Sequence, residues 1–165
     1  MQYMMKQKLF SWGDDFYIKD ENGTDRFFVD GKVFSLGNQL SFQDLSRQEL
    51  CFIKQVVLSW GPTYEIYKGE CLWATVKKEL FTFSHCRFEV DEPGAVHLEA
   101  EGDFMDHHYV FTRGAKQVAD VSMEYFTLGD NYGVNILAGE EDVLILACTV
   151  VIDMACHERK HGIIS

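Results

Sequence analysis

The apolar run from Val143 to Ile152 constrains the fold more than any other stretch of the chain. Every residue in it is Val, Leu, Ile, Ala, Cys or Thr, and a helix that is apolar on all sides must be buried on all sides. At about ten to fourteen residues the run is too short to cross a bilayer and longer than most strands. Carboxylates precede it (Glu140–Asp142) and cations follow it (Arg159 and Lys160), the order that a helix dipole favours. We therefore predict a central, buried helix over about 141–158.

Short aromatic-centred signatures recur every 22 to 24 residues before this helix. They are Phe10-Ser-Trp-Gly13, Phe34-Ser-Leu-Gly37, Leu58-Ser-Trp-Gly61, Phe81-Thr-Phe-Ser84, Phe104-Met-Asp-His107 and Phe126-Thr-Leu-Gly129. A period of this size indicates a repeated supersecondary unit. Each signature is followed by an alternating run, a turn and a second apolar run, and Asn22-Gly23 is typical of a hairpin turn. The body of the chain, about residues 3–137, therefore reads as six units of two antiparallel strands.

The size of a twelve-stranded ring explains the buried helix. Strands spaced by about 4.8 Å and tilted by about 40° close at twelve into a ring roughly 24 Å across. Inward side chains would leave a lumen about 12 Å wide, and a helix with its side chains is about 10–12 Å in diameter. The predicted fold class is all-β with one helix: a closed antiparallel barrel of about 12 strands around a buried C-terminal hydrophobic helix. We expect one domain over residues 1–165, with a short tail at 159–165.

Charge and cysteine usage limit the partners and the compartment. The chain of 165 residues has a net charge of −11, which argues against nucleic acid as a partner. Its five cysteines (Cys51, Cys71, Cys86, Cys148, Cys156) show no CxxC spacing, and no signal-peptide pattern or transmembrane segment is evident. We expect reduced thiols in a cytoplasmic protein.

Several stretches carry a resemblance to a known family: Lys19–Gly23, Ser59–Ile66, Glu99–Phe104, and Asp142–Ala147 with Val150–Met154. In these the chain resembles the LURP-one-related family, in its bacterial YxjI-like branch, from Tyr3 to about Glu158. That resemblance implies the Tubby C-terminal fold shared with phospholipid scramblases, a twelve-stranded barrel around a helix. It implies no settled biochemical activity. Relatives often carry a basic pair where this chain has Ser122–Tyr125.

The string His157-Glu-Arg-Lys-His161 matches the HExxH pattern of zinc proteases. On a helix it would place two imidazoles on one face, with Glu158 as general base. Only four residues follow it, so no third ligand lies downstream. We interpret it as an exposed helix end and keep a metal-dependent hydrolase as the second alternative function.

Three further polar groups are weaker candidates. In Asp106-His107-His108, adjacent strand residues point to opposite faces, so the two histidines would not converge. The stretch from Asp130 to Asp142 is rich in oxygen ligands but lacks the calcium-loop pattern, and we interpret it as a polar turn before the helix. Asp153 interrupts the apolar helix, in a row with Thr149 and His157. We expect it near the barrel mouth, hydrated or bonded to loop amides, rather than catalytic.

Several lysines precede the signatures at equivalent points of successive units. They are Lys6, Lys8, Lys32, Lys54, Lys77 and Lys78, and we call them the lysine rim, because equivalent points of up-and-down units lie at the same end of a barrel. Tubby-like relatives bind phosphoinositides, so a lipid headgroup or another phosphate is the ligand that the resemblance suggests. The opposing interpretation is that Lys protects strand ends and that carboxylates crowd the same end, namely Asp14, Asp15, Asp103, Asp106 and Asp130.

The sequence leads to a non-enzymatic, cytoplasmic binding or scaffold domain whose ligand is unknown. No cofactor, catalytic residue or metal ligand is predicted. The first alternative is a peripheral membrane module that binds acidic phospholipid headgroups or a phosphorylated ligand through the lysine rim. A protein partner is the other class of partner that the sequence leaves open.

Overall fold

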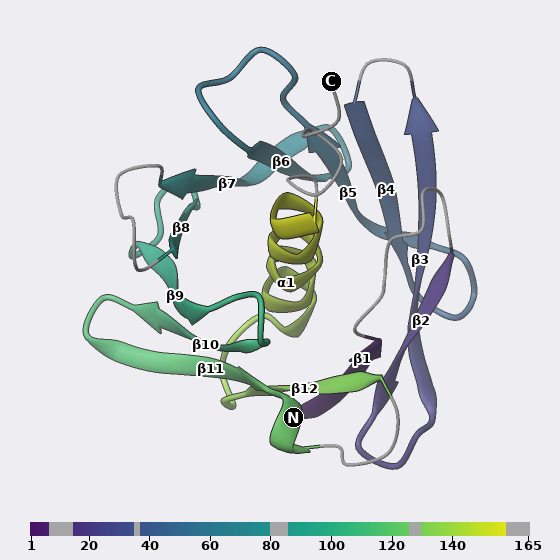
Figure 1. The fold of residues 1–165 in the computed structure, drawn as a ribbon. Coiled ribbons are helices and arrows are strands. Elements are labelled where there is room, and N and C mark those ends of the chain that lie inside the picture. Colours follow the sequence, from purple (N-terminus) through teal and green to yellow (C-terminus); the bar gives the residue numbers. More distant parts are fainter. Residues whose placement is uncertain (7–14, 35–36, 80–85, 126–129, 158–165) are drawn as a thin grey trace, which may run out of the picture.

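The computed structural model is a closed barrel of twelve antiparallel strands around one helix (Figure 1). It describes residues 1–6, 15–34, 37–79, 86–125 and 130–157, with the backbone alone at 32–34, 86 and 157. The strands are β1 (Gln2–Lys6), β2 (Phe16–Asp20), β3 (Asp25–Phe34), β4 (Gly37–Gln43), β5 (Glu49–Gln55), β6 (Thr63–Lys68), β7 (Cys71–Glu79), β8 (Cys86–Asp91), β9 (Leu98–Asp103), β10 (His108–Arg113), β11 (Lys116–Ser122) and β12 (Asn131–Ile136). A short 3₁₀ helix (Met123–Tyr125) follows β11, and α1 covers Asp142–His157. The predicted fold class is confirmed.

Each strand pairs with its neighbour in the chain, and β1 closes the ring by pairing with β12. The expectation of six two-strand units is wrong in one respect. Five hairpins run from β2 to β11, and the last unit supplies β12 alone before the chain turns into the helix. The twelfth strand comes instead from Gln2–Lys6, ahead of the first signature. The ring is therefore closed by the two chain ends, with Tyr3 opposite Val134.

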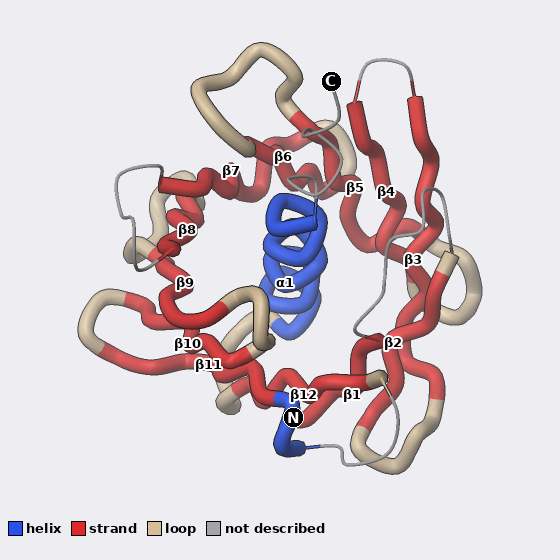
Figure 2. Tube along the Cα trace, in the orientation of Figure 1, coloured by secondary structure: helices blue, strands red, loops and turns tan. Residues whose placement is uncertain are grey.

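The up-and-down order gives the barrel two distinct ends. Every odd-numbered strand ends at the end where α1 also finishes, which we call the exit end. Every even-numbered strand ends at the opposite end, where α1 begins, which we call the entry end. Figure 2 shows the helix running through the ring between them. The lysine rim was predicted from this same up-and-down order, and its described members, Lys6, Lys32, Lys54, Lys77 and Lys78, lie toward the exit end.

The helix is buried on every side, as its sequence requires. All thirteen residues from Leu144 to Cys156 are buried, including the polar Thr149 and Asp153. Inward side chains of the strands fill the space around it, among them the large aromatics Phe42, Tyr64 and Phe88. This agrees with the predicted fit of a helix in a twelve-stranded lumen.

Two polar contacts fix the start of the helix at the entry end. The hydroxyl of Tyr3 in β1 donates to Asp142 Oδ2 at 2.5 Å. Arg113, at the end of β10, donates from Nε to Glu140 Oε2 at 3.1 Å and from Nη1 to Glu92 Oε1 at 2.7 Å. The carboxylates at the start of the helix therefore bind the barrel wall.

No helix in the described part of the chain is long and apolar enough to cross a membrane.

Candidate functional site

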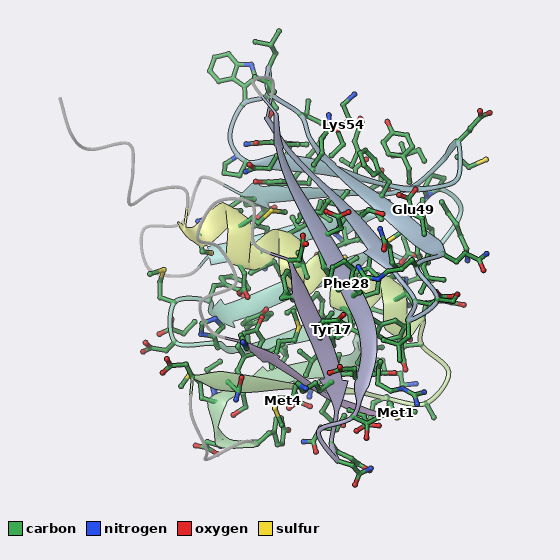
Figure 3. The ribbon with its side chains drawn as sticks, turned by 90° about the vertical axis from the view of Figure 1, so that its right-hand side faces the viewer. Met1, Met4, Tyr17, Phe28, Glu49 and Lys54 are labelled. Carbon is green, nitrogen blue, oxygen red and sulfur yellow. The ribbon has the colours of Figure 1, made fainter. Side chains whose placement is uncertain are left out.

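Three of the rim lysines are exposed at the exit end. Lys6 ends β1, Lys54 lies next to the last residue of β5, and Lys77 lies near the end of β7. Figure 3 shows Lys54 on the outer side of the wall, nearer the exit end than Glu49 of the same strand. None of the three takes part in an ion pair with another described residue.

The other three rim positions differ. Lys78 is buried, with its ammonium 5.7 Å from the centre of the Phe88 ring, because adjacent residues of a strand point to opposite faces and Lys77 takes the outer one. Lys32 lies in β3 opposite Gln39, and only its backbone is described. Lys8 lies outside the described residues. Among the rim side chains that the structure describes, the exposed ones are therefore Lys6, Lys54 and Lys77.

Carboxylates stand beside the exposed lysines, which limits the local charge. Lys54 pairs in register with Glu65, and Lys77 with Glu89. A shallow pocket on the outer face of β7 and β8 is lined by Thr75, Lys77, Glu89, Asp91 and His97. The outer wall near Lys77 is thus of mixed charge rather than a basic patch.

A second group of polar side chains lies inside the barrel near the exit end. We call Asp153, Tyr132, His107, Tyr109 and Thr149 the interior cluster. The Tyr132 hydroxyl donates to Asp153 Oδ2, and His107 Nε2 lies 3.5 Å from Asp153 Oδ1. The rings of His107 and Tyr132 stack with centroids 4.3 Å apart. The Asp153 carboxylate therefore accepts a hydrogen bond from a side chain of β12, and the His107 ring from the turn between β9 and β10 lies beside it.

Burial dominates the electrostatics of the interior cluster. It raises the pKa of Tyr132 and the pKa of Tyr109 well above the usual value of a phenol, and the negative charge of Asp153 adds to both shifts. Both hydroxyls therefore keep their protons at neutral pH. The Thr149 hydroxyl donates to the Ile145 carbonyl at 2.9 Å, one turn back along α1. No member of the interior cluster is more than 5% exposed.

The expectation that Asp153 is hydrated is wrong, because the residue is only 2% exposed. It does lie toward the exit end of the barrel, and it accepts a hydrogen bond from the Tyr132 phenol. Tyr132 and His107 were not identified as its partners. The available signal was the carboxylate itself, because a buried charge in an apolar helix needs partners. The two histidines do diverge as predicted: His107 is buried and His108 is exposed.

Metal binding has little support among the described side chains. No group of three or more His, Cys, Asp or Glu residues in the described part of the chain is placed to hold a metal ion. In the oxygen-rich stretch before the helix, Asp142 accepts from Tyr3 and Glu140 from Arg113. The string from Glu158 to His161 lies outside the described residues, as does the side chain of His157.

The thiols of the buried cysteines are poorly reactive. Cys51, Cys71, Cys148 and Cys156 are free thiols, and all but Cys71 are buried. Burial raises the pKa of Cys51 to about 12, and it raises the pKa of Cys148 as well. A thiol that stays protonated is a poor nucleophile and metal ligand, so these two residues act as small apolar side chains.

Comparison with known proteins gives a consistent assignment. The model of one family, described as LURP-one-related, matches residues 1–153. An uncharacterised Bacillus subtilis (strain 168) protein, YxjI, is 36% identical over 161 residues, which cover 97% of this chain and 96% of that one. An X-ray structure of a protein from Arabidopsis thaliana has the same fold, with a TM-score of 0.67 and 18% identity over 94% of this chain and 91% of that one. The family model and the sequence identity show that the chain belongs to the LURP-one-related family.

Proposed function

We propose that this chain is a non-enzymatic binding or scaffold domain that recognises its partner with its outer surface. The observation that carries the proposal is the occupied interior. A barrel that binds a small ligand inside keeps a lumen for it, whereas here α1 takes that space and all its residues from Leu144 to Cys156 are buried. The cytoplasm is the proposed setting, since its reducing conditions suit the four free thiols among the described side chains.

The burial of the interior cluster supports the non-enzymatic part of the proposal. A Tyr–Asp–His arrangement has the groups for acid–base chemistry, but a substrate must come within hydrogen-bond reach of them. With Asp153 at 2% exposure and Tyr132 at 0%, a substrate would have to displace the packed core first. We assign the interior cluster to holding the end of α1 in register with the wall.

A metal analysis tests this proposal against the hydrolase alternative. Chain purified without an affinity tag should contain no stoichiometric zinc, because no group of three or more His, Cys, Asp or Glu residues in the described ranges is placed to hold a metal ion. One zinc per chain that disappears in a His157→Ala variant would contradict the non-enzymatic proposal.

A second candidate function is binding of an acidic phospholipid headgroup or another phosphate through the lysine rim. It is favoured by the three exposed lysines at one end of the barrel, none in an ion pair with a described residue. Each cation near an anionic surface contributes about 1 kcal/mol, so a few lysines give weak binding. The neighbouring Glu65 and Glu89 reduce this further.

Charge reversal tests the second candidate. Lys54→Glu combined with Lys77→Glu should abolish sedimentation with phosphatidylserine vesicles and leave the melting temperature nearly unchanged, because both side chains are exposed. The matched control is Arg26→Glu with Lys116→Glu, the same charge change on exposed residues at the entry end. Equal losses in the two double variants, or no binding by the unmutated chain, would remove the lysine rim as a site.

A further inference from the structure

The loop between β5 and β6 carries the two most exposed large hydrophobic side chains of the described residues. Leu58 is 97% exposed and Trp60 is 98% exposed, and no other large apolar side chain in the described ranges exceeds 62%. Figure 2 shows this loop, residues 56–62, extending beyond the barrel wall. Leaving a Leu and a Trp fully in water forfeits free energy that burial would recover, so such a tip indicates a contact that the isolated chain does not make.

The loop keeps its shape without help from these two side chains. The Ser59 hydroxyl bonds the Val56 carbonyl at 3.0 Å and the Gly61 carbonyl at 2.7 Å. Backbone bonds run from Gly61 N to Ser59 O at 3.0 Å and from Val56 N to Thr63 O at 2.9 Å. The backbone N–H of Lys78 donates to the Pro62 carbonyl at 3.1 Å, which fixes the end of the loop that leads into β6. The tip is therefore a preformed turn that presents Leu58 and Trp60 outward.

Cations flank both stems of the loop. Lys54 lies two residues before Val56, and Lys77 pairs in register with Thr63, directly after Pro62. Both are exposed on the outer wall. An apolar tip with Trp at its apex and lysines behind it matches the layers of a membrane surface, where Trp prefers the interface and Lys meets acidic headgroups.

We propose that the loop at residues 56–62 docks this chain on a bilayer containing acidic phospholipid by inserting Leu58 and Trp60 into the interfacial layer. This rests on the second candidate function and adds the anchoring element that three lysines alone do not provide. A bilayer suits the tip better than a protein groove, because the tip is a convex turn whose carbonyls at Val56 and Gly61 are already bonded within the loop. The net charge of −11 opposes long-range attraction, so binding depends on the inserted side chains.

Vesicle sedimentation with the full chain tests the proposal. With phosphatidylcholine–phosphatidylserine vesicles, Leu58→Ser with Trp60→Ser should weaken partitioning by at least about tenfold. The matched control, Leu45→Ser with Val96→Ser, removes two exposed apolar side chains at the entry end and should bind as the unmutated chain does. Vesicles should also shift the emission of Trp60 to shorter wavelength, a shift that Trp60→Leu abolishes.

Further outcomes separate this proposal from the rim proposal. Soluble inositol hexakisphosphate should perturb the amide resonances near Lys54 and Lys77 equally in the unmutated chain and in the Leu58→Ser, Trp60→Ser variant. If inositol hexakisphosphate perturbs these resonances in both chains but the loop variant binds vesicles normally, the loop proposal is overturned and the rim proposal stands. A concentration-dependent dimer that the loop variant loses would overturn membrane docking and assign the tip to a second copy of the chain.

Discussion

At the residue scale, Asp153 is the side chain that most needs bonding partners, because its carboxylate is buried. An ionised carboxylate inside an apolar barrel is costly unless it is bonded, and its bonded partner Tyr132 lies 21 residues away in the chain. His107 adopts a positive φ of 49°, a conformation that non-glycine residues rarely adopt, and in it the imidazole stacks on Tyr132. The turn between β9 and β10 thus adopts a rare backbone conformation at the residue that contacts Asp153.

Removing the Tyr132 hydroxyl should therefore lower the stability of the fold. Tyr132→Phe leaves a buried carboxylate oxygen without its donor, and we expect a loss of about 1–3 kcal/mol in the free energy of unfolding, measured by urea titration. The matched control is Tyr125→Phe, which removes a phenol that donates to Asp120 on the surface and should cost less than about 1 kcal/mol. Equal losses in the two variants would mean that the interior hydrogen bond contributes no more to the free energy of unfolding than the surface one does.

Stability should also fall in alkali because of the interior phenols. The tyrosines of the unfolded chain ionise near pH 10 or so, whereas burial holds the pKa of Tyr109 and the pKa of Tyr132 well above that value in the fold. The unfolded state then binds fewer protons than the native state, so the contribution of these groups is complete below about pH 10 and is lost as the pH rises further. Urea titrations from about pH 8 to about pH 11 should show this decline, and Tyr109→Phe should make it shallower. A stability that stays flat over that range would contradict the burial of both groups.

At the element scale, the hairpin of β9 and β10 depends on a close approach that only glycine permits. Gly102 has φ of +143°, and a Cβ there would lie 2.6 Å from the His108 carbonyl oxygen and 2.7 Å from the Tyr109 Cα. Tyr109 is the register partner of Gly102 and a member of the interior cluster. The absence of a side chain at Gly102 thus allows β9 and β10 to come close together at Tyr109.

An alanine at this position should open the hairpin. We expect Gly102→Ala to lower the free energy of unfolding by about 2–5 kcal/mol, from backbone strain and the overlap with β10. Gly69→Ala is the control, because Gly69 has a positive φ of 61° with nothing within 4 Å of the added Cβ, and it should cost about 1 kcal/mol. Similar losses at the two positions would show that the overlap at Gly102 relaxes freely.

At the scale of the whole molecule, the architecture was readable from the chain because it follows from patterns of composition. An all-apolar run of helical length must be buried. A repeat of 22 to 24 residues indicates a series of units that each contain a pair of strands. The strand that closes the ring was not attributed to Gln2–Lys6, because one short alternating run carries no signal of what it pairs with.

The candidate sites were less predictable for a physical reason. Whether a side chain points in or out depends on register at a strand end, so Lys77 and Lys78 could not be separated before the pairing with β8 was known. The interior cluster joins α1, β12 and the β9–β10 turn, and no spacing along the chain encodes that meeting. Leu58 belongs to a repeated signature, and nothing in that signature distinguishes an exposed position from a buried one.

The central claim is that α1 is the core of the barrel and not an appendage to it. The run from Val143 to Ile152 contributes nine buried side chains, Leu144–Ile152. Large apolar side chains are worth about 1.5–3 kcal/mol each when buried, so their sum is at least comparable with the net stability of about 5–15 kcal/mol that is typical of a domain. Strands alone would close around a lumen that their inward side chains do not fill. Calorimetry and size-exclusion chromatography of residues 1–141 test this directly. Aggregated or molten protein without a cooperative transition is the predicted result, whereas a soluble monomer that melts cooperatively would contradict the architecture.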